Sequence, residues 1–227
     1  MMRCIALLLA LLLAACSGPQ HEALLPGATV LVLGDSLSYG TGAARGQDYP
    51  SILAASTGWN IVNAGVPGDT TAAGLERLPE LLEQYTPQLL LVELGGNDFL
   101  RHIPNGETES NLRAILMLAK AEGVATLLVA VPTPSLLRAT LSGLTDDPLF
   151  ERIADETETP LIRDVFSDVL SEQELKSDAV HANAAGYRQV AEGMRAALQH
   201  LPMGIPLAAR CALHPSVPRL NADDETY

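Results

Sequence analysis

Short apolar runs that stop at glycine or proline constrain this chain more than any other feature of its sequence. Five runs of strand length occur, at 29–33, 61–64, 89–94, 126–131 and, more weakly, 160–162. Longer segments with helical patterns separate them. This alternation predicts an α/β fold whose parallel strands are joined by right-handed crossovers. Because the strands are continuously apolar, we expect helices to cover both faces of the sheet.

Three of the expected helices can be placed from their residue patterns. Apolar residues recur at helical spacing from Leu112 to Ala119, between the third and fourth runs. The last helix is expected to begin near Asn183. The segment 74–84 is also helical in pattern, but Pro79 is expected to break or restart that helix.

The N-terminal segment has the pattern of a secretory signal. Residues 1–15 have a positively charged start, about ten apolar residues and a small-residue end. The apolar part is shorter than the roughly 20 residues of a membrane-spanning helix. Leu13-Ala14-Ala15-Cys16 resembles a bacterial lipobox, so we expect Cys16 to carry lipid after cleavage. By the same resemblance, Ser17 favours the outer membrane, facing the periplasm. A plain signal peptide and a buried N-terminal helix are the alternatives.

The rest of the chain divides into a tether, one domain and a tail. We expect residues 16–27 to be the lipidated cysteine and its tether, 28–202 the domain, and 203–227 an irregular C-terminal tail rich in proline and acidic residues. With Cys4 removed and Cys16 lipidated, the remaining cysteine has no intramolecular partner, so no disulfide is expected.

Charge and composition exclude several functions. The net charge is −13, which argues against binding of nucleic acid or anionic membranes by charge, so membrane attachment should come from the lipid. Aromatic residues make up only 4%, which disfavours a sugar-stacking surface. Cysteine and histidine are too scattered for a structural zinc site. No glycine motif for a dinucleotide or a phosphate is present.

Polar segments follow three of the apolar runs. They read GDS from Gly34, GVPGD from Gly65 and GGND from Gly95. In parallel α/β sheets, sites form outside the carboxyl ends of the strands. Ser36 of the first segment is therefore a candidate nucleophile, although a serine at this position can also be a simple helix N-cap.

A serine nucleophile needs a base, and His181 is the candidate. Asp178 precedes it by three residues, so in a turn the carboxylate can reach the second ring nitrogen and fix the tautomer. The rival is His102, which follows Asp98 by four residues. For Asp178 and His181 the alternative is a helix-capping turn with a surface histidine.

Acyl transfer also needs donors for the negative charge that develops on the carbonyl oxygen. Asn97 offers an uncharged side-chain amide, Gly68 offers an unobstructed backbone N–H, and the backbone N–H of Ser36 is a third donor. The alternatives are that Gly68 only permits a turn and that Asn97 only ends a strand.

The ordered set GDSLSYG, NAGVPGDTTAAGLERLP, VELGGND and DAVH resembles the SGNH, or GDSL, hydrolases. It is most similar to their bacterial branch of acyl-thioesterase, lysophospholipase and arylesterase enzymes, over roughly residues 28–200. The resemblance implies a three-layer α/β/α sandwich with a flavodoxin-like, roughly five-stranded parallel sheet. It implies no metal and no organic cofactor.

The resemblance also assigns roles to the candidate residues. Ser36 is implied to be the nucleophile, His181 the base and Asp178 the residue that orients it. Ser36, Gly68 and Asn97 are implied to form the oxyanion hole.

The sequence departs from the family at two places. Ala182 follows the histidine where the family often has proline or leucine. The segment 132–148 matches no family pattern, and we expect it to border the acyl pocket.

We expect a serine ester hydrolase that acts on small acyl or aryl esters, or on lysophospholipids. The alternatives are a carbohydrate or peptidoglycan O-acetylesterase on the same fold, and a non-catalytic envelope lipoprotein that binds ligands.

Overall fold

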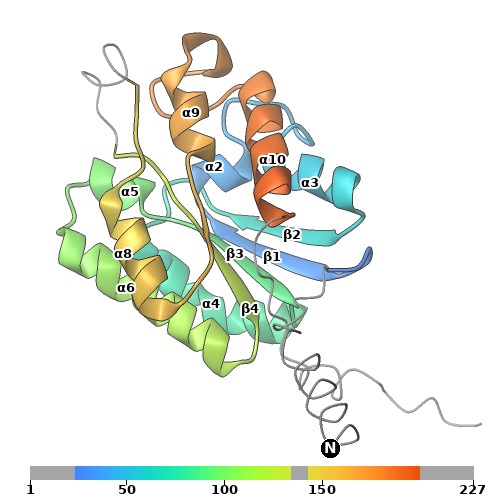
Figure 1. The fold of residues 1–227 in the computed structure, drawn as a ribbon, viewed down its shortest axis with the longest axis vertical. Helices are drawn as coiled ribbons and strands as arrows, with labels where there is room; N and C mark the ends of the chain where they lie inside the picture. The colour runs from blue at the N-terminus through green and yellow to red at the C-terminus, as the bar shows by residue number, and fades with distance from the viewer. Residues whose placement is uncertain (1–23, 134–142, 200–227) are drawn as a thin grey trace, which may run out of the picture.

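The computed structural model describes residues 24–133 and 143–199, which form one parallel sheet between two layers of helices (Figure 1). The strands are β1 (Thr29–Gly34), β2 (Asn60–Gly65), β3 (Leu89–Glu93), β4 (Ala125–Val129) and β5 (Leu161–Ile162). Their order is β2-β1-β3-β4-β5, and each neighbouring pair is parallel. This is the flavodoxin-like order, so the predicted α/β/α fold is confirmed.

The two helical layers are built from segments that alternate with the strands. The described helices are α2 (Ser36–Tyr39), α3 (Tyr49–Thr57), α4 (Thr71–Tyr85), α5 (Gly96–Leu100), α6 (Asn105–Ala121), α8 (Pro148–Thr157), α9 (Val165–Ser171), the short 3₁₀ helix η2 (Gln173–Leu175) and α10 (Ala184–Leu198). Helices α3 and α10 cover one face with α9 beside α10, and α4, α6 and α8 cover the other (Figure 1). As predicted, α10 begins next to Asn183, whose side-chain oxygen caps it.

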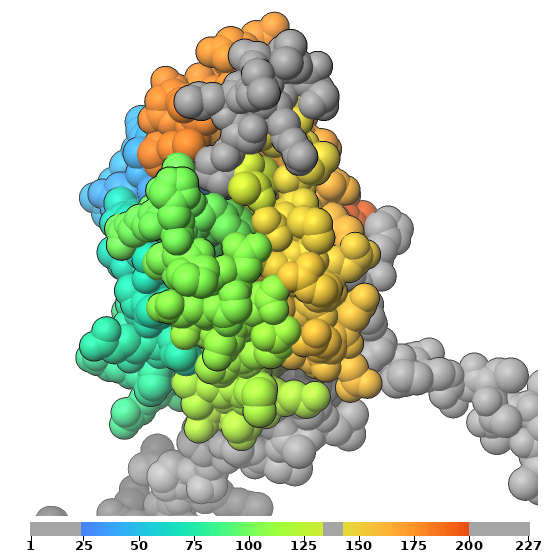
Figure 2. Space-filling view, turned by 90° about the vertical axis from the view of Figure 1, so that its left-hand side faces the viewer, coloured from blue at the N-terminus to red at the C-terminus, as the bar shows by residue number. Residues whose placement is uncertain are grey.

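The outer surface of the second layer is joined by ion pairs. Helices α6 and α8 lie side by side on this face (Figure 2). Arg113 of α6 bridges Glu109 and Glu156, and Arg152 of α8 also contacts Glu109. Exposed pairs of this kind contribute little each, so the layer is held mainly by its apolar inner face.

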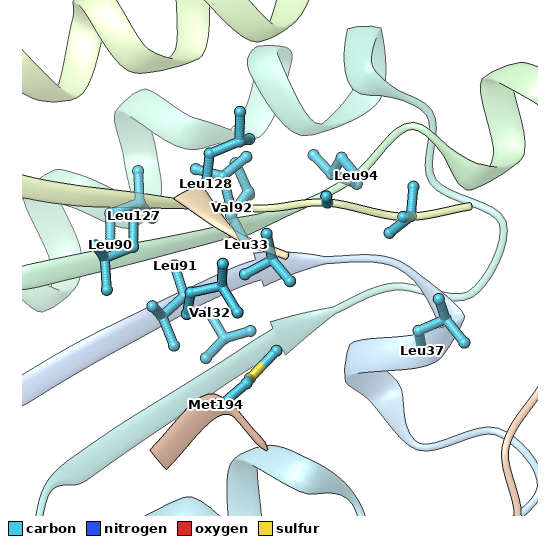
Figure 3. Packing of buried hydrophobic residues seen from close by; sticks show 14 of the residues in the cluster. Val32, Leu33, Leu37, Leu90, Leu91, Val92, Leu94, Leu127, Leu128 and Met194 are labelled. Atoms are coloured by element: carbon cyan, nitrogen blue, oxygen red, sulfur yellow. The ribbon is translucent and has the colours of Figure 1, made fainter. Parts of the chain in front are cut away.

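The core lies on both sides of the two central strands. Leucine and valine side chains of β1, β3 and β4 pack together there, and Met194 of α10 closes one face (Figure 3). On the opposite face Gly74 lets α4 approach closely, because a β-carbon there would lie 2.3 Å from Leu94 Cδ1. Burial of this apolar area is the main stabilising contribution, at roughly 25 cal/mol per Å².

The prediction that Pro79 breaks the helix over 74–84 is wrong. Helix α4 runs without interruption from Thr71 to Tyr85 with Pro79 inside it. Pro79 is on the exposed side of α4, while Leu78 and Leu82 are buried. Water can therefore satisfy the carbonyl that loses its donor, and burial of the leucine face outweighs the cost of the proline.

Several sequence predictions concern residues that the structure does not describe. The signal at 1–15, Cys16, the first part of the tether and the tail at 203–227 lie outside the described residues. Within the tether range, Leu24 is buried and its carbonyl accepts a hydrogen bond from Trp59 Nε1. Among the helices of the described ranges, none combines the length and the apolar character that crossing a membrane requires.

Candidate active site

The first polar segment forms a tight turn between β1 and α2. Asp35 is the N-cap of α2, and its Oδ1 accepts the N–H of Leu37 at 2.9 Å. Ser36 therefore does not cap the helix, and its hydroxyl is not occupied by capping. Gly34 is required before this turn, because a β-carbon there would lie 2.0 Å from Ser38 Oγ.

His181 lies in a short loop between η2 and α10. A backbone bridge between Lys176 and Ala182 closes the loop. Within it, Asp178 Oδ1 accepts the backbone N–H groups of Val180 and His181, both at 2.9 Å. The same carboxyl group contacts the imidazole, with Oδ2 2.8 Å from Nδ1. The Asp178 carboxyl group thus fixes the backbone of the loop and also orients the His181 ring.

The ring brings Ser36 and Asp178 into one hydrogen-bonded series. His181 Nε2 is 3.0 Å from Ser36 Oγ. With Nδ1–H donating to Asp178, Nε2 remains an acceptor for the Ser36 hydroxyl. Burial alone would raise the pKa of Asp178, but the Val180 N–H and the His181 ring hold this pKa below its ordinary value. The carboxylate form is therefore available to stabilise an imidazolium.

Asn97 and Gly68 line the same cavity as Ser36 and belong to two other segments. Asn97 is in α5, directly after β3, and its Nδ2 donates to Asp35 Oδ2 at 2.8 Å. Gly68 is in the loop between β2 and α4 with φ +85°, a conformation that favours glycine. Its carbonyl accepts a hydrogen bond from Arg101 at 2.6 Å.

These residues border a cavity of about 640 Å³. Ser36, Gly68, Asn97 and His181 all line it. The remaining lining is mostly apolar and includes Leu37, Pro67, Phe99, Leu100, Val131, Pro132, Leu144, Leu170 and Val180. Pro132 and Leu144 belong to the segment 132–148, so that segment borders the pocket as expected.

The rival histidine is not paired with its acidic neighbour. His102 lines the same cavity, but Asp98 is fully buried and accepts hydrogen bonds from Thr71 and Thr108. The structure therefore joins Ser36 to His181 and gives His102 no carboxyl partner among the described hydrogen bonds.

Two buried acids under the turn were missed from the sequence. Asp35 is 2% exposed, and burial raises its pKa to about 6. Glu93, at the end of β3, is fully buried, and its Oε2 accepts both the N–H and the hydroxyl of Ser38. Burial, and then the charge of Asp35, raises the pKa of Glu93 well above its ordinary value. For Glu93, the signal that could have been used was an acidic residue at the end of an otherwise apolar strand.

A metal centre is not evident in the part of the chain that the structure describes. No group of three or more histidine, cysteine, aspartate or glutamate side chains there could hold an ion.

A hydroxyl, an imidazole and a carboxyl group in hydrogen-bonded series are the arrangement of serine hydrolases. Here they lie at the carboxyl edge of a flavodoxin-like sheet. The model of the GDSL-like lipase/acylhydrolase family matches residues 32–189, and the chain belongs to this family.

Named relatives agree with this assignment. The chain is 35% identical over 178 residues to thioesterase 1/protease 1/lysophospholipase L1 of Escherichia coli (strain K12), covering 76% of this chain and 84% of that protein. It is 31% identical over 198 residues to an arylesterase of Vibrio mimicus, covering 85% and 95%.

A solved structure is similar as well. The psychrotrophic esterase EstA from Pseudoalteromonas sp., in a form inhibited by monoethylphosphonate, superimposes with a TM-score of 0.66 at 27% identity, covering 76% of this chain and 97% of that one. Family and relatives together make the chain an ester-hydrolysing enzyme.

Proposed function

We propose that Ser36 is the nucleophile of this ester hydrolase, that His181 is its general base and acid, and that Asp178 orients the imidazole. The observation that carries the proposal is the 3.0 Å contact between His181 Nε2 and Ser36 Oγ, with Asp178 on the other ring nitrogen. In this geometry the hydroxyl can pass its proton to Nε2 without a change of backbone conformation.

The reaction then follows in two halves. Ser36 Oγ attacks the carbonyl carbon while His181 takes its proton. The bond to the leaving alcohol breaks as His181 returns that proton to the alcohol oxygen, which leaves an acyl-Ser36 ester. Water, deprotonated by His181, attacks this ester, and the acid is released with Ser36 restored.

Three hydrogen-bond donors are proposed to stabilise the negative charge of each tetrahedral intermediate. They are the backbone N–H groups of Ser36 and Gly68 and the side-chain amide of Asn97. An amide has two N–H donors, and Asp35 occupies one of those of Asn97. The second is available for the developing oxyanion, and Asp35 fixes its direction.

The cavity supports esters whose acyl or aryl group is apolar. Leucine, valine, proline and phenylalanine side chains dominate its lining. Of the polar groups, the His181 ring contacts Ser36, and the Asn97 amide contacts the adjacent Asp35. An alkyl chain or an aromatic ring gains free energy by leaving water for such a pocket. The names of the E. coli and Vibrio relatives, a lysophospholipase and an arylesterase, support lysophospholipids and aryl esters as candidate substrates.

We further propose that the enzyme is attached to the outer membrane through lipid on Cys16 and faces the periplasm. The support is the lipobox-like Leu13-Ala14-Ala15-Cys16 sequence. Fractionation of cells that produce the full chain tests this proposal. Wild type should be found in the membrane fraction and Cys16→Ala should not; release of both into the soluble fraction would contradict it.

A fluorophosphonate probe tests the nucleophile. Wild type should be labelled on Ser36, and Ser36→Ala should lose both labelling and ester turnover. Ser51→Ala is the matched control, because Ser51 is in α3 and its hydroxyl donates to Asp48. Labelling of Ser36→Ala at the wild-type rate would overturn the assignment.

A substrate series tests the pocket. p-Nitrophenyl esters from acetyl to decanoyl should show kcat/KM rising with chain length until the cavity is filled, and lysophospholipids should be cleaved. A preference for acetyl esters, acetylated sugars included, would contradict the apolar-pocket proposal.

A further inference from the structure

We propose that Asp98 is a positioning residue that fixes the Gly68 loop relative to Asn97. This inference rests on the proposed function, because it takes Gly68 and Asn97 as oxyanion donors. Nothing in it requires Asp98 to touch the substrate, since Asp98 is fully buried.

The two proposed donors belong to different segments. Gly68 is in the loop that leads from β2 to α4, and Asn97 is in α5, which follows β3. Their spacing therefore depends on how the start of α4 is held against α5. Strands β2 and β3 are not neighbours, because β1 lies between them. Pairing between these two strands cannot set the spacing directly.

Asp98 makes the buried connection between these segments. Its Oδ2 accepts the backbone N–H of Thr71 at 2.9 Å, and its Oδ1 accepts the Thr71 hydroxyl at 2.5 Å. Thr71 is the first residue of α4, three residues after Gly68. Asp98 itself directly follows Asn97 in α5. The Asp98 carboxyl group thus links α5, where Asn97 precedes it, to Thr71 at the end of the loop that carries Gly68.

The connection needs a carboxyl group in particular. Thr108 of α6 also donates to Oδ1, at 3.2 Å, so all three groups that face the side chain are donors. An asparagine offers only one acceptor oxygen. If its NH₂ group replaces Oδ2, it faces the Thr71 N–H, which is also a donor. In the flipped orientation the NH₂ group must donate to the Thr71 hydroxyl, which already accepts from Asn111 Nδ2 at 3.1 Å, so the hydroxyl proton loses its acceptor. In a buried site that mismatch costs the desolvation of the unpaired group.

Apart from Asp98, one largely buried side-chain contact among the described residues holds the Gly68 loop, the ion pair between Arg77 and Asp69 at 2.8 Å. Val66 and Pro67 are exposed, and the Arg101 side chain that holds the Gly68 carbonyl is on the surface. Loss of the Asp98 connection should therefore let the loop shift. Oxyanion donors act over a narrow range of distances, and a shift of about 1 Å can cost on the order of 10²-fold in rate.

The first test is kinetic. Asp98→Asn should lower kcat for a p-nitrophenyl ester by about 10–10²-fold, with KM changed much less. Thr71→Val keeps the backbone N–H contact to Asp98 but loses the hydroxyl, which donates to Asp98 and accepts from Asn111. It should lower kcat by a smaller factor, and Thr71→Ser should restore it. Thr108→Val is the matched control: it also removes a hydrogen bond to Asp98 but lies outside both donor segments. It should lower stability with less effect on kcat than Thr71→Val.

A double-mutant cycle separates positioning from a general loss of stability. In an Asn97→Ala background, the factor lost on Asp98→Asn should be at least threefold smaller than in wild type, because one of the two positioned donors is already gone. An equal factor in both backgrounds would overturn the inference and leave the proposed function intact. If Asn97→Ala itself keeps wild-type kcat, the oxyanion assignment fails, and the inference fails with it.

Discussion

The two sides of Ser36 hold their acids in opposite environments. On the outer side, Asp178 is in a surface loop with 52% of its side chain exposed. On the inner side, Asp35, Glu93 and Asp98 are 2% exposed or less. The outer acid touches the imidazole, and the inner acids accept hydrogen bonds from the turn and from the neighbouring segments.

This difference separates two tasks of a carboxyl group. An exposed carboxylate keeps its charge at low cost and can stabilise the imidazolium each time the ring takes up a proton. A buried one is expensive and is retained only where several donors meet it, so its position is defined within a narrow range. The outer side is therefore suited to proton transfer and the inner side to fixing geometry.

The largest effect is expected on the outer side. His181→Ala should lower kcat by about 10⁴-fold or more, because no base then faces Ser36. Ester turnover and urea unfolding of the same preparation measure this loss and confirm folding. His102→Ala, in the same cavity, should lower kcat less than tenfold. The reverse order of the two variants would assign the base to His102.

A smaller loss is expected for the exposed carboxyl group. Asp178→Ala should lower kcat by about 10²–10³-fold, less than His181→Ala, because water can reach the Nδ1 side of the ring and replace part of the interaction. The variant also loses the two backbone hydrogen bonds inside the loop. A loss equal to that of His181→Ala would remove the contrast between the two sides.

The smallest effect concerns stability on the inner side. Burial raises the pKa of Asp35 from 3.8 to about 6. Between these values the folded protein binds the proton more tightly than the unfolded chain, so the Asp35 contribution to the free energy of unfolding falls as pH rises from about 4 to about 6. Relative to Asp35→Asn, wild type should lose about 2–3 kcal/mol of stability over this range.

Urea unfolding at a series of pH values between 4 and 7.5 measures that difference. Asp178→Asn is the control, since the pKa of Asp178 is lowered in the fold. Its contribution to the free energy of unfolding is lost mainly below about pH 4, so it should change little over this series. Parallel stability curves for wild type and Asp35→Asn would show that Asp35 titrates as an ordinary surface carboxyl group.

The sheet could be predicted closely because its signals are local. Each strand contains a short apolar run, and the predicted ends lie within two residues of the observed ends, as for β3 at Leu89–Glu93. The exception was Pro79, where burial of one helix face outweighed a local preference. A local rule cannot weigh the packing of distant segments.

The site could be predicted only in part for the same reason. Residue type and spacing made Ser36, Asp178 and His181 candidates, and they meet in the structure. The inner acids could not be assigned, since Glu93 meets Ser38 across 55 residues and Asp98 meets Thr71 across 27. The spacing of residues along the chain does not predict such partners.

The segment 132–148 is closed at its base by described contacts. Pro132 pairs with Asp146, and the Thr133 hydroxyl donates to Asp147. Among the described residues of this segment, Pro132 and Leu144 line the cavity, and neither belongs to the elements that carry Ser36 or His181. Exchange of the segment 132–148 for one of different length should therefore change which esters are accepted and leave the positions of Ser36 and His181 unchanged.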